Sequence, residues 1–499
     1  MISCTVNFKD NLTKNIPYYK LLLKQINDVQ GIPYSGDGFI GENAALYSSG
    51  SEVLSKICEG YQFIIAFDGE LTDKAALTKE LKALGYCFTA ETDSELALLC
   101  YIHFGEKSPG KLSGCFSYVI YDTMRRQVFA ASDFFASSPL FYAKTDNSYL
   151  FASQIRGILA HPDIKPTLSK EGVSRLLSQN GLYTGSIFNG IEMLPPAHFL
   201  KIRDGNIILK PYTLTDCETP TSQDLFISEL SAACKNDGKT GVFNTGSSCD
   251  RLLCHIAAEI EAKKYSRISI YSTETLNLPK KYTAIHTHII PSEGELRSSL
   301  AACVSVHGMP VFSGTDFLLP TVFKAAAENE IKLITQQPDL YSQKISLRSI
   351  LIKNNVLHPA VEETLLPEES GFTYIGSRQL AGSFKADIKI PLLSRKLYQF
   401  IKLQEKPLEF FDALLKTCTG DTKTCTNYGL LTLKKLRRIL LEIISSDSAP
   451  ILAFFRKGAL LSLCEKGVED ISNLQDETAF LAYIIKLNIW LCSFRPFIN

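Results

Sequence analysis

"VFNTGSSCDRLL" (residues 242–253) has the pattern of a strand that enters a tight turn and continues as a helix. Val242 and Phe243 suit the end of a buried strand, and the residues from Arg251 onward have the apolar spacing of an amphipathic helix. The middle of the segment consists of turn and helix-capping residues, namely Thr245, Gly246, Ser247 and Ser248. A small polar loop at a helix N-terminus suits phosphate, so the segment predicts a nucleotide loop or the remains of one.

The sequence around this loop predicts a parallel sheet. "KTGVFN" (239–244) precedes the loop, "DRLLCHIAAEIEAK" (250–263) follows it, and "RISIYST" (267–273) comes next. Strand, helix and strand in this order are typical of a βαβ unit. From about residue 390 the pattern is mostly helical. We therefore predict an α/β domain with many helices over residues 206–499.

The first part of the chain has a different pattern, rich in short strands. Strands or hairpins are predicted at 61–71, 114–122, 126–133 and 139–153. A polar segment without periodicity, "TLTDCETPTSQD" (213–224), is the best candidate for a linker. Residues 1–205 are therefore predicted to form a layered α+β domain.

Composition limits the classes of function. The chain has 499 residues, a formal net charge of zero, 45% hydrophobic residues and 21% charged residues, which indicates a folded protein of two or three domains. The balanced charge gives no general attraction to nucleic acid or to an anionic membrane. We find no leader-like segment and no apolar run long enough to span a bilayer, so a cytoplasmic location without a membrane span is expected. The 14 cysteines are scattered, which favours reduced thiols over disulfides or zinc.

Several segments, taken in chain order, resemble the asparagine synthetase family. They are "FDGELTD" (67–73), "TAETDSEL" (89–96), "LSGCFSYVIYD" (112–122), "ASDFFASSPLFY" (131–142), "GSIFNGIEMLPPAHFL" (185–200), "IKIPLLSRKLYQFI" (388–401) and "LNIWLCSF" (487–494). The resemblance implies an N-terminal Ntn-hydrolase-like glutaminase domain of the class II amidotransferase type. It also implies that a synthetase domain of the ATP-pyrophosphatase type follows.

The resemblance also locates a glutamine pocket, and this chain departs from the family there. The family mechanism needs a cysteine directly after the initiator methionine, whereas Ile2 occupies that place and Cys4 fits a buried strand position better. No arginine is present in residues 42–49, where the family has its clamp for the glutamine carboxylate.

Four residues mark the remainder of that pocket: Asp68, Gly69, Glu70 and Asp93. Asp68 replaces an asparagine that donates to the oxyanion in the family, and an ionised carboxylate accepts hydrogen bonds only. Asp93 matches the carboxylate that binds the substrate ammonium group. We therefore predict a degenerate pocket without glutaminase activity.

The nucleotide loop is altered as well. Its remaining candidates for contact with pyrophosphate are Phe243, Thr245, Gly246, Ser247, Ser248 and Asp250. Cys249 stands where the family has its magnesium-binding aspartate, and sulfur is a poor ligand for a hard cation. Asp250, one residue later, and Asp339 are the remaining candidates for metal ligands. Lys423 is the nearest match to the family's catalytic lysine.

Two readings of function remain open. The first is a pseudoenzyme or binding partner in which amide formation is lost or strongly altered. The second is a glutamine-independent, ATP-dependent amide ligase or cyclase, similar to enzymes that close β-lactam rings or lasso peptides. ATP and Mg²⁺ are expected only if the chain is active as such a carbon–nitrogen ligase. A companion biosynthetic protein, a peptide or a small carboxylate would be the partner. A glutamine-dependent asparagine synthetase ranks last, because it requires both altered chemistries.

Overall fold

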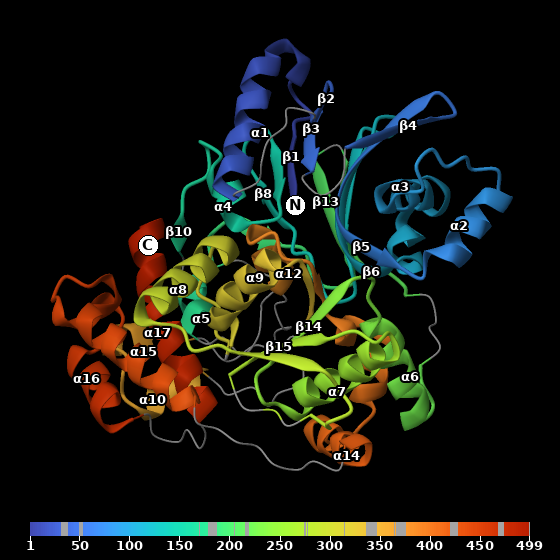
Figure 1. Cartoon of the computed structure of the whole chain (residues 1–499). Coiled ribbons are helices and arrows are strands. Elements are labelled where there is room, and N and C mark those ends of the chain that lie inside the picture. The colour runs from blue at the N-terminus through green and yellow to red at the C-terminus, as the bar shows by residue number, and fades with distance from the viewer. Residues whose placement is uncertain are drawn as a thin grey trace.

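The computed structural model describes two layered units that lie against each other (Figure 1). It describes the whole chain except residues 31–37, 49–52, 169, 178–186, 204, 215–218, 274–275, 277, 314, 336–346, 364, 366–375, 420–427, 468–473 and 499. The first part of the chain forms the unit at the top of Figure 1, and the parallel strands and most later helices form the unit below it.

The upper unit contains two antiparallel sheets. One has the order β11-β8-β9-β1-β3-β2, formed by Ile191–Met193, Phe141–Lys144, Tyr149–Ala152, Ile2–Val6, Ala44–Ser48 and Phe39–Ile40. The other has the order β13-β12-β7-β6-β5-β4, formed by Asn206–Pro211, His198–Arg203, Gln127–Ser132, Ser113–Asp122, Tyr61–Thr72 and Leu54–Cys58. Because β13 follows residue 205 and pairs with β12, the second sheet continues beyond the predicted boundary of 1–205.

The two sheets bury apolar side chains against each other. Alternate residues of a strand face the same side, so Ile2, Cys4 and Val6 of β1 all enter the core between the sheets. Ile64 and Ala66 of β5 reach the same core from the opposite sheet. The interior of this unit is thus built from the alternating strands that the sequence predicts.

Helices cover both outer faces of this sandwich. Helices α1 (Ile16–Gln30) and α4 (Ile155–Leu159) lie on the β1 side, while α2 (Lys74–Ala83) and α3 (Asp93–Phe104) cover the β5 side. The result is a helix–sheet–sheet–helix arrangement (Figure 1). It confirms the predicted layered α+β fold of the Ntn-hydrolase type.

The lower unit is built on a five-stranded parallel sheet. Its order is β16-β15-β14-β17-β18, with strands Ala284–His288, Ile268–Ser272, Lys239–Asn244, Ile331–Ile334 and Ile388–Lys389. One apolar cluster packs α6 (Gln223–Cys234), α7 (Ser248–Lys263), α13 (Arg395–Lys402) and α14 (Pro407–Thr419) together with β14 and β15. This sheet confirms the predicted α/β pattern, and β14, α7 and β15 are the predicted βαβ unit.

The remaining helices complete a larger apolar cluster. They are α5 (Lys170–Leu177), α8 (Glu293–His307), α9 (Leu319–Glu328), α10 (Leu347–Lys353), α11 (Pro359–Glu362), α12 (Ser377–Ser383), α15 (Tyr428–Ser445), α16 (Lys457–Lys466) and α17 (Leu474–Phe494). Within α17, Asp476–Phe494 is long and apolar enough to cross a membrane, but 67% of its most apolar window is buried inside the protein. Packing against α8 and α15 therefore accounts for its apolar character.

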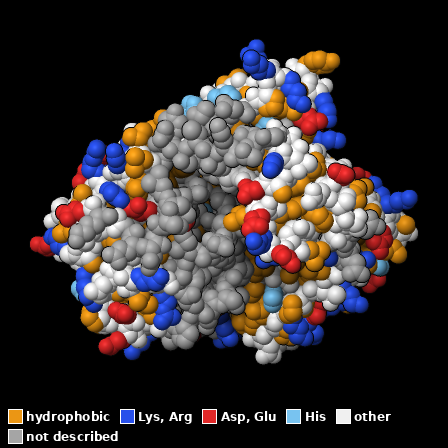
Figure 2. Space-filling view, turned by 90° about the horizontal axis from the view of Figure 1, so that it is seen from below, with side chains coloured by type: hydrophobic (Ala, Val, Ile, Leu, Met, Phe, Trp, Pro, Cys, Tyr) orange, Lys and Arg blue, Asp and Glu red, His pale blue; other side chains and the backbone are white. Residues whose placement is uncertain are grey.

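The two units share this core. The ring centroids of Phe188, from the first half, and Trp490 of α17 are 5.6 Å apart, and the Tyr483 hydroxyl donates to the carbonyl of Leu176. A short strand pair, β10 (Thr167–Leu168) with β19 (Phe497–Ile498), also joins the halves. On the described part of the face in Figure 2, acidic and basic side chains are interspersed, as the balanced net charge leads one to expect.

Candidate functional site

Three of the predicted pocket residues lie together near the end of β5. Asp68, Gly69 and Glu70 face β6, where they pair with Ser117, Phe116 and Cys115 respectively. The α-amino group of Met1 donates to Asp68 Oδ1 at 2.9 Å. The start of β1 therefore lies beside the predicted pocket, and the Asp68 carboxylate accepts a hydrogen bond from it.

Gly69 is fixed by backbone geometry. Its φ is +132°, which side-chain-bearing residues rarely adopt, and a Cβ added there would lie 2.0 Å from the Cys115 carbonyl oxygen. The close approach of β5 to β6 therefore requires glycine at this position.

Gly69→Ala is expected to lower the free energy of unfolding by at least about 2 kcal/mol, because it combines backbone strain with a steric clash. Chemical denaturation followed by circular dichroism measures this loss. Gly294→Ala in α8 is the matched control, since nothing lies within 4 Å of the added Cβ. There the change should be neutral or stabilising by up to about 1 kcal/mol. Equal effects at the two positions would refute the steric argument.

Asp93, the second acidic residue of the predicted pocket, is already paired. It begins α3, its Oδ2 accepts from the Leu71 amide at 2.8 Å, and its Oδ1 lies 2.7 Å from Lys74 Nζ. The carboxylate that the resemblance assigns to a substrate ammonium group thus holds an ammonium group of this chain.

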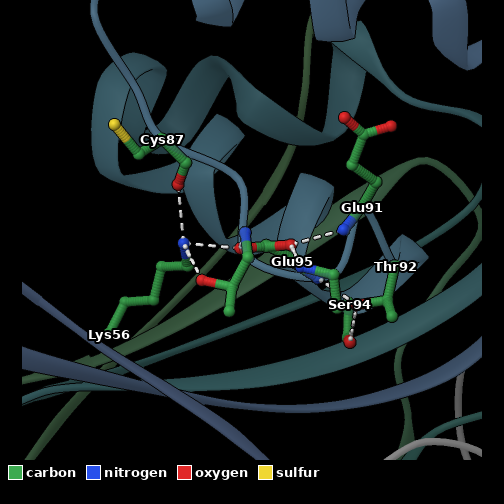
Figure 3. A network of polar contacts seen from close by, with 8 residues as sticks. Lys56, Cys87, Glu91, Thr92, Ser94 and Glu95 are labelled. Carbon is green, nitrogen blue, oxygen red and sulfur yellow. Dashed lines mark hydrogen bonds and ion pairs between the residues drawn. The ribbon is translucent and has the colours of Figure 1, made fainter.

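Glu95, two residues further along α3, organises the segment before this helix (Figure 3). Its two oxygens accept from the backbone amides of Thr89, Ala90 and Glu91 at 2.6–2.9 Å. Lys56, from β4, pairs with Glu95 and also donates to the Cys87 carbonyl at 2.8 Å. Burial alone raises the pKa of Glu95, but Lys56 and the amides outweigh it and lower the pKa to about 2. Glu95 is thus a structural anchor for residues 87–92.

Asp133 has a similar role beneath the pocket. It is 1% exposed and accepts from the amides of Phe116, Phe135 and Ser137 at 2.7–3.0 Å, and from the Ser137 hydroxyl at 2.7 Å. Burial raises the pKa of Asp133 even though these hydrogen bonds oppose the change. The turn after β7 is therefore held by a carboxylate at the position that the resemblance identifies as a motif aspartate.

An arginine from the second half of the chain lies against this acidic group. Arg378 of α12 is 3.8 Å from Glu70 Oε2, and its neighbour Gln379 donates to the Ser153 carbonyl of the upper unit. Burial alone lowers the pKa of Arg378, but surrounding groups outweigh it and raise the pKa; they are Cys115, Asp68, Glu70 and Asp133. No sequence pattern predicts a role for Arg378, because this residue lies far from the pocket motifs along the chain and outside every motif that resembles the family.

Two thiols near this region have raised pKa values. Cys4 lies in β1 with its side chain in the core, and burial raises its thiol pKa strongly. Burial also raises the pKa of Cys115 to about 11, although Arg378 opposes the change. Neither sulfur has the thiolate character of a nucleophile at neutral pH.

The predicted nucleotide loop joins β14 to α7 as the sequence indicates. The Thr245 amide donates to Asp250 Oδ2 at 2.9 Å, and the Thr245 hydroxyl donates to the same oxygen. The Gly246 amide donates to Asn244 Oδ1 at 3.0 Å, and Ser247 caps α7 by accepting from the Asp250 amide at 3.1 Å. Several polar groups of the loop therefore bond to one another.

Most residues that flank the loop are buried or bonded within the chain. Phe243 is 2% exposed in the larger core, and the partly exposed Ser248 donates to Asp412. Cys249 is buried in the cluster around α7, where burial raises its pKa well above the ordinary value. Asp250 is only 1% exposed, with its carboxylate turned toward Thr245.

The other predicted residues of this site lie outside the described residues. Asp339 falls in 336–346 and Lys423 in 420–427. The roles of Asp250 and Asp339 as metal ligands, and of Lys423 as the catalytic lysine, therefore stay predictions. Among the residues that the structure does describe, no group of three or more His, Cys, Asp or Glu side chains could hold a metal ion.

Comparison with known proteins identifies the first unit. Residues 47–213 match the family described as glutamine amidotransferase domain. Asparagine synthetase [glutamine-hydrolyzing] 3 of Bacillus subtilis is 34% identical over 174 residues, which cover 34% of this chain and 28% of that protein. Asparagine synthetase 1 of the same organism is 27% identical over 236 residues, covering 45% and 37%. Amidase chry2 of Gibberella zeae is 31% identical over 142 residues, covering 27% and 20%.

Residues 47–213 thus form a domain of the glutamine amidotransferase class. Over part of its length the chain is similar to glutamine-hydrolysing asparagine synthetases. The chain spans about a third of the length of the relatives it matches, 28% and 37% for the two Bacillus subtilis proteins. A solved glutamine phosphoribosylpyrophosphate amidotransferase of Bacillus subtilis aligns over 85% of this chain and 98% of its own, with 12% identity and a TM-score of 0.32.

Proposed function

We propose that this chain is a member of the asparagine synthetase family that neither hydrolyses glutamine nor forms amides, and that it acts by binding a partner. One observation carries the proposal: acidic side chains of both candidate sites are held by contacts within the chain. Asp93 is paired with Lys74, and Asp250 accepts from Thr245. A biosynthetic protein, a peptide or a small carboxylate is the partner class that fits the family.

The glutamine side of the proposal rests on charge. An oxyanion needs hydrogen-bond donors, whereas the Asp68 carboxylate only accepts and carries negative charge itself. Cys4, the cysteine nearest the start of the chain, is enclosed in the core. Lys74 already occupies the carboxylate that a substrate ammonium group would need. Binding and attack would therefore both be impaired.

The nucleotide side rests on the chemistry of the donor set. Magnesium in a triphosphate complex requires free oxygen ligands, and the Asp250 oxygen nearest the loop already accepts twice from Thr245. The sulfur of Cys249 lies in an apolar cluster. The described residues of the loop do not fit a Mg²⁺–ATP complex, so no catalytic step is assigned to one.

Two measurements on the full chain test the proposal. Incubation with glutamine should release no glutamate above the uncatalysed rate, and calorimetry should detect no Mg²⁺–ATP binding at millimolar concentrations. The Bacillus subtilis asparagine synthetase 3 serves as the positive control in both assays. Glutamate release, or saturable Mg²⁺–ATP binding, would contradict the corresponding half of the proposal.

The second candidate function is a glutamine-independent, ATP-dependent amide ligase or cyclase. It is favoured by the retained order of strand, loop and helix, and by Gly246, whose φ of +95° keeps the turn that a phosphate loop needs. ATP and Mg²⁺ would be its cofactors. Pyrophosphate exchange into ATP in the presence of amino-acid or peptide carboxylates would establish this function in place of the first.

A further inference from the structure

The outer strand of the parallel sheet is accessible to solvent. In the described part of the chain β16 ends the sheet on one side, and four of its five residues, from Ile285 to His288, are exposed. Strands of parallel sheets are normally covered on both faces and consist mainly of apolar residues. The exposed side chains of β16 are polar apart from Ile285, so this strand presents polar groups that a solute can reach.

Two of these polar groups are histidines on one face of the strand. His286 and His288 are the only two of the eight histidines in the sequence that are two positions apart. Alternate residues of a strand point to the same side, with their Cβ atoms about 7 Å apart. Their register partners in β15 are Ile270 and Ser272, which fixes both histidines to one regular strand. The strand therefore holds two imidazoles side by side.

The two rings are close enough to influence each other. Partial burial lowers the pKa of His286, and the neighbouring His288 lowers it further. A neutral imidazole keeps the nitrogen lone pair that a metal ion needs, whereas a protonated imidazole does not. At neutral pH His286 is therefore in the form that binds a metal.

The spacing of the pair suits a chelate. A bound metal ion lies about 2.1 Å from each imidazole nitrogen, so the two nitrogens must approach each other to about 3–4 Å. Rotation of the two side chains closes this distance, because each ring nitrogen lies several ångströms beyond its Cβ. No third histidine, cysteine or carboxylate among the described residues joins the pair, so water fills the other positions of the metal.

We propose that His286 and His288 form a two-ligand chelate for a divalent transition metal ion that favours imidazole, namely Ni²⁺, Cu²⁺ or Zn²⁺. The pair lies at the outer edge of the sheet, two strands from β14, which precedes the loop 245–247. It differs in chemistry from a magnesium site, because Mg²⁺ prefers oxygen ligands. The inference is therefore independent of the proposed function.

Calorimetric titration of the full chain with Ni²⁺ near neutral pH tests the proposal. Ni²⁺ binds imidazole and does not oxidise thiols. His286→Gln and His288→Gln should each weaken Ni²⁺ binding by at least about tenfold, because a single ring loses the advantage of a tethered second ligand. His103→Gln on α3, which alters another exposed histidine, is the control and should leave the affinity unchanged. Ni²⁺ bound by cysteines elsewhere is common to all these proteins, so the differences report on the pair.

A further variant separates a chelate from two independent imidazoles. Thr287→His combined with His288→Thr keeps the number of histidines and moves one ring to the opposite face of the strand. This double variant should bind Ni²⁺ as weakly as the single variants, while the melting temperature of the metal-free protein stays the same. Equal affinity of the double variant and the unaltered chain, or no loss of affinity in His286→Gln, would overturn the proposal.

Discussion

Lys486→Met is expected to lower the free energy of unfolding by about 3–5 kcal/mol, the loss typical when one partner of a buried ion pair is removed. Lys486 of α17 is 0% exposed and donates to both Asp316 oxygens, at 2.8 and 2.9 Å, and to the Val311 carbonyl. Without the ammonium, the Asp316 carboxylate stays buried among apolar helices with its main partner gone. Urea unfolding followed by fluorescence of the single tryptophan, Trp490, reports on this same helix.

A second variant separates the ion pair from simple packing. In Lys486→Met combined with Asp316→Leu, both charges are replaced by apolar groups of similar size, so most of the stability should return. Lys24→Met, which removes an exposed pair with Asp28 on α1, should have little effect. A loss of unfolding free energy below about 1 kcal/mol for Lys486→Met would show that the ion pair with Asp316 contributes little to stability.

Glu95→Gln is expected to cost about 3 kcal/mol at pH 7, and the cost should disappear in acid. The folded pKa of Glu95 is about 2, against an ordinary value of 4.5. A lowered pKa means that the stabilisation is complete above about pH 4.5 and is lost as the pH falls toward 2. Below pH 2 the Glu95 carboxyl is protonated in both the folded and the unfolded state. The variant and the unaltered chain should then be equally stable.

Equilibrium unfolding of both proteins at several pH values between 7 and 3 measures this convergence. Glu91→Gln is the control, because Glu91 pairs with Lys82 while its side chain is 60% exposed. That variant should differ little from the unaltered chain at any pH. A Glu95→Gln deficit that stays constant with pH would attribute the effect to packing instead of charge.

Much of the fold was predictable because the signals were local. The alternating segment at 61–71 became β5, the segments at 114–122 and 126–133 became β6 and β7, and the hairpin at 139–153 became β8 and β9. Each depends on a period of two and a turn, which neighbouring residues set by themselves. The strand β13 was missed although it pairs with β12, the strand directly before it in the chain, so the prediction overlooked a local signal.

The candidate sites were predictable only in part. Asp68, Gly69 and Glu70 are consecutive, so one motif located all three. Arg378 is different, because its place beside Glu70 arises from packing of α12 against the upper unit, which no spacing in the sequence encodes. Likewise, the sequence placed Asp250 in the loop but did not show that its carboxylate bonds back to Thr245.

The core shared by the two units has a consequence for how such chains could be recombined. Ile155 and Ile158 of the first half belong to the same apolar cluster as Leu296 and Trp490 of the second. A fragment containing either half alone would present that cluster to water, where such surfaces promote aggregation. Gene fusions that exchange one half for an unrelated domain should therefore yield insoluble products unless the new domain covers the exposed cluster with a complementary apolar surface.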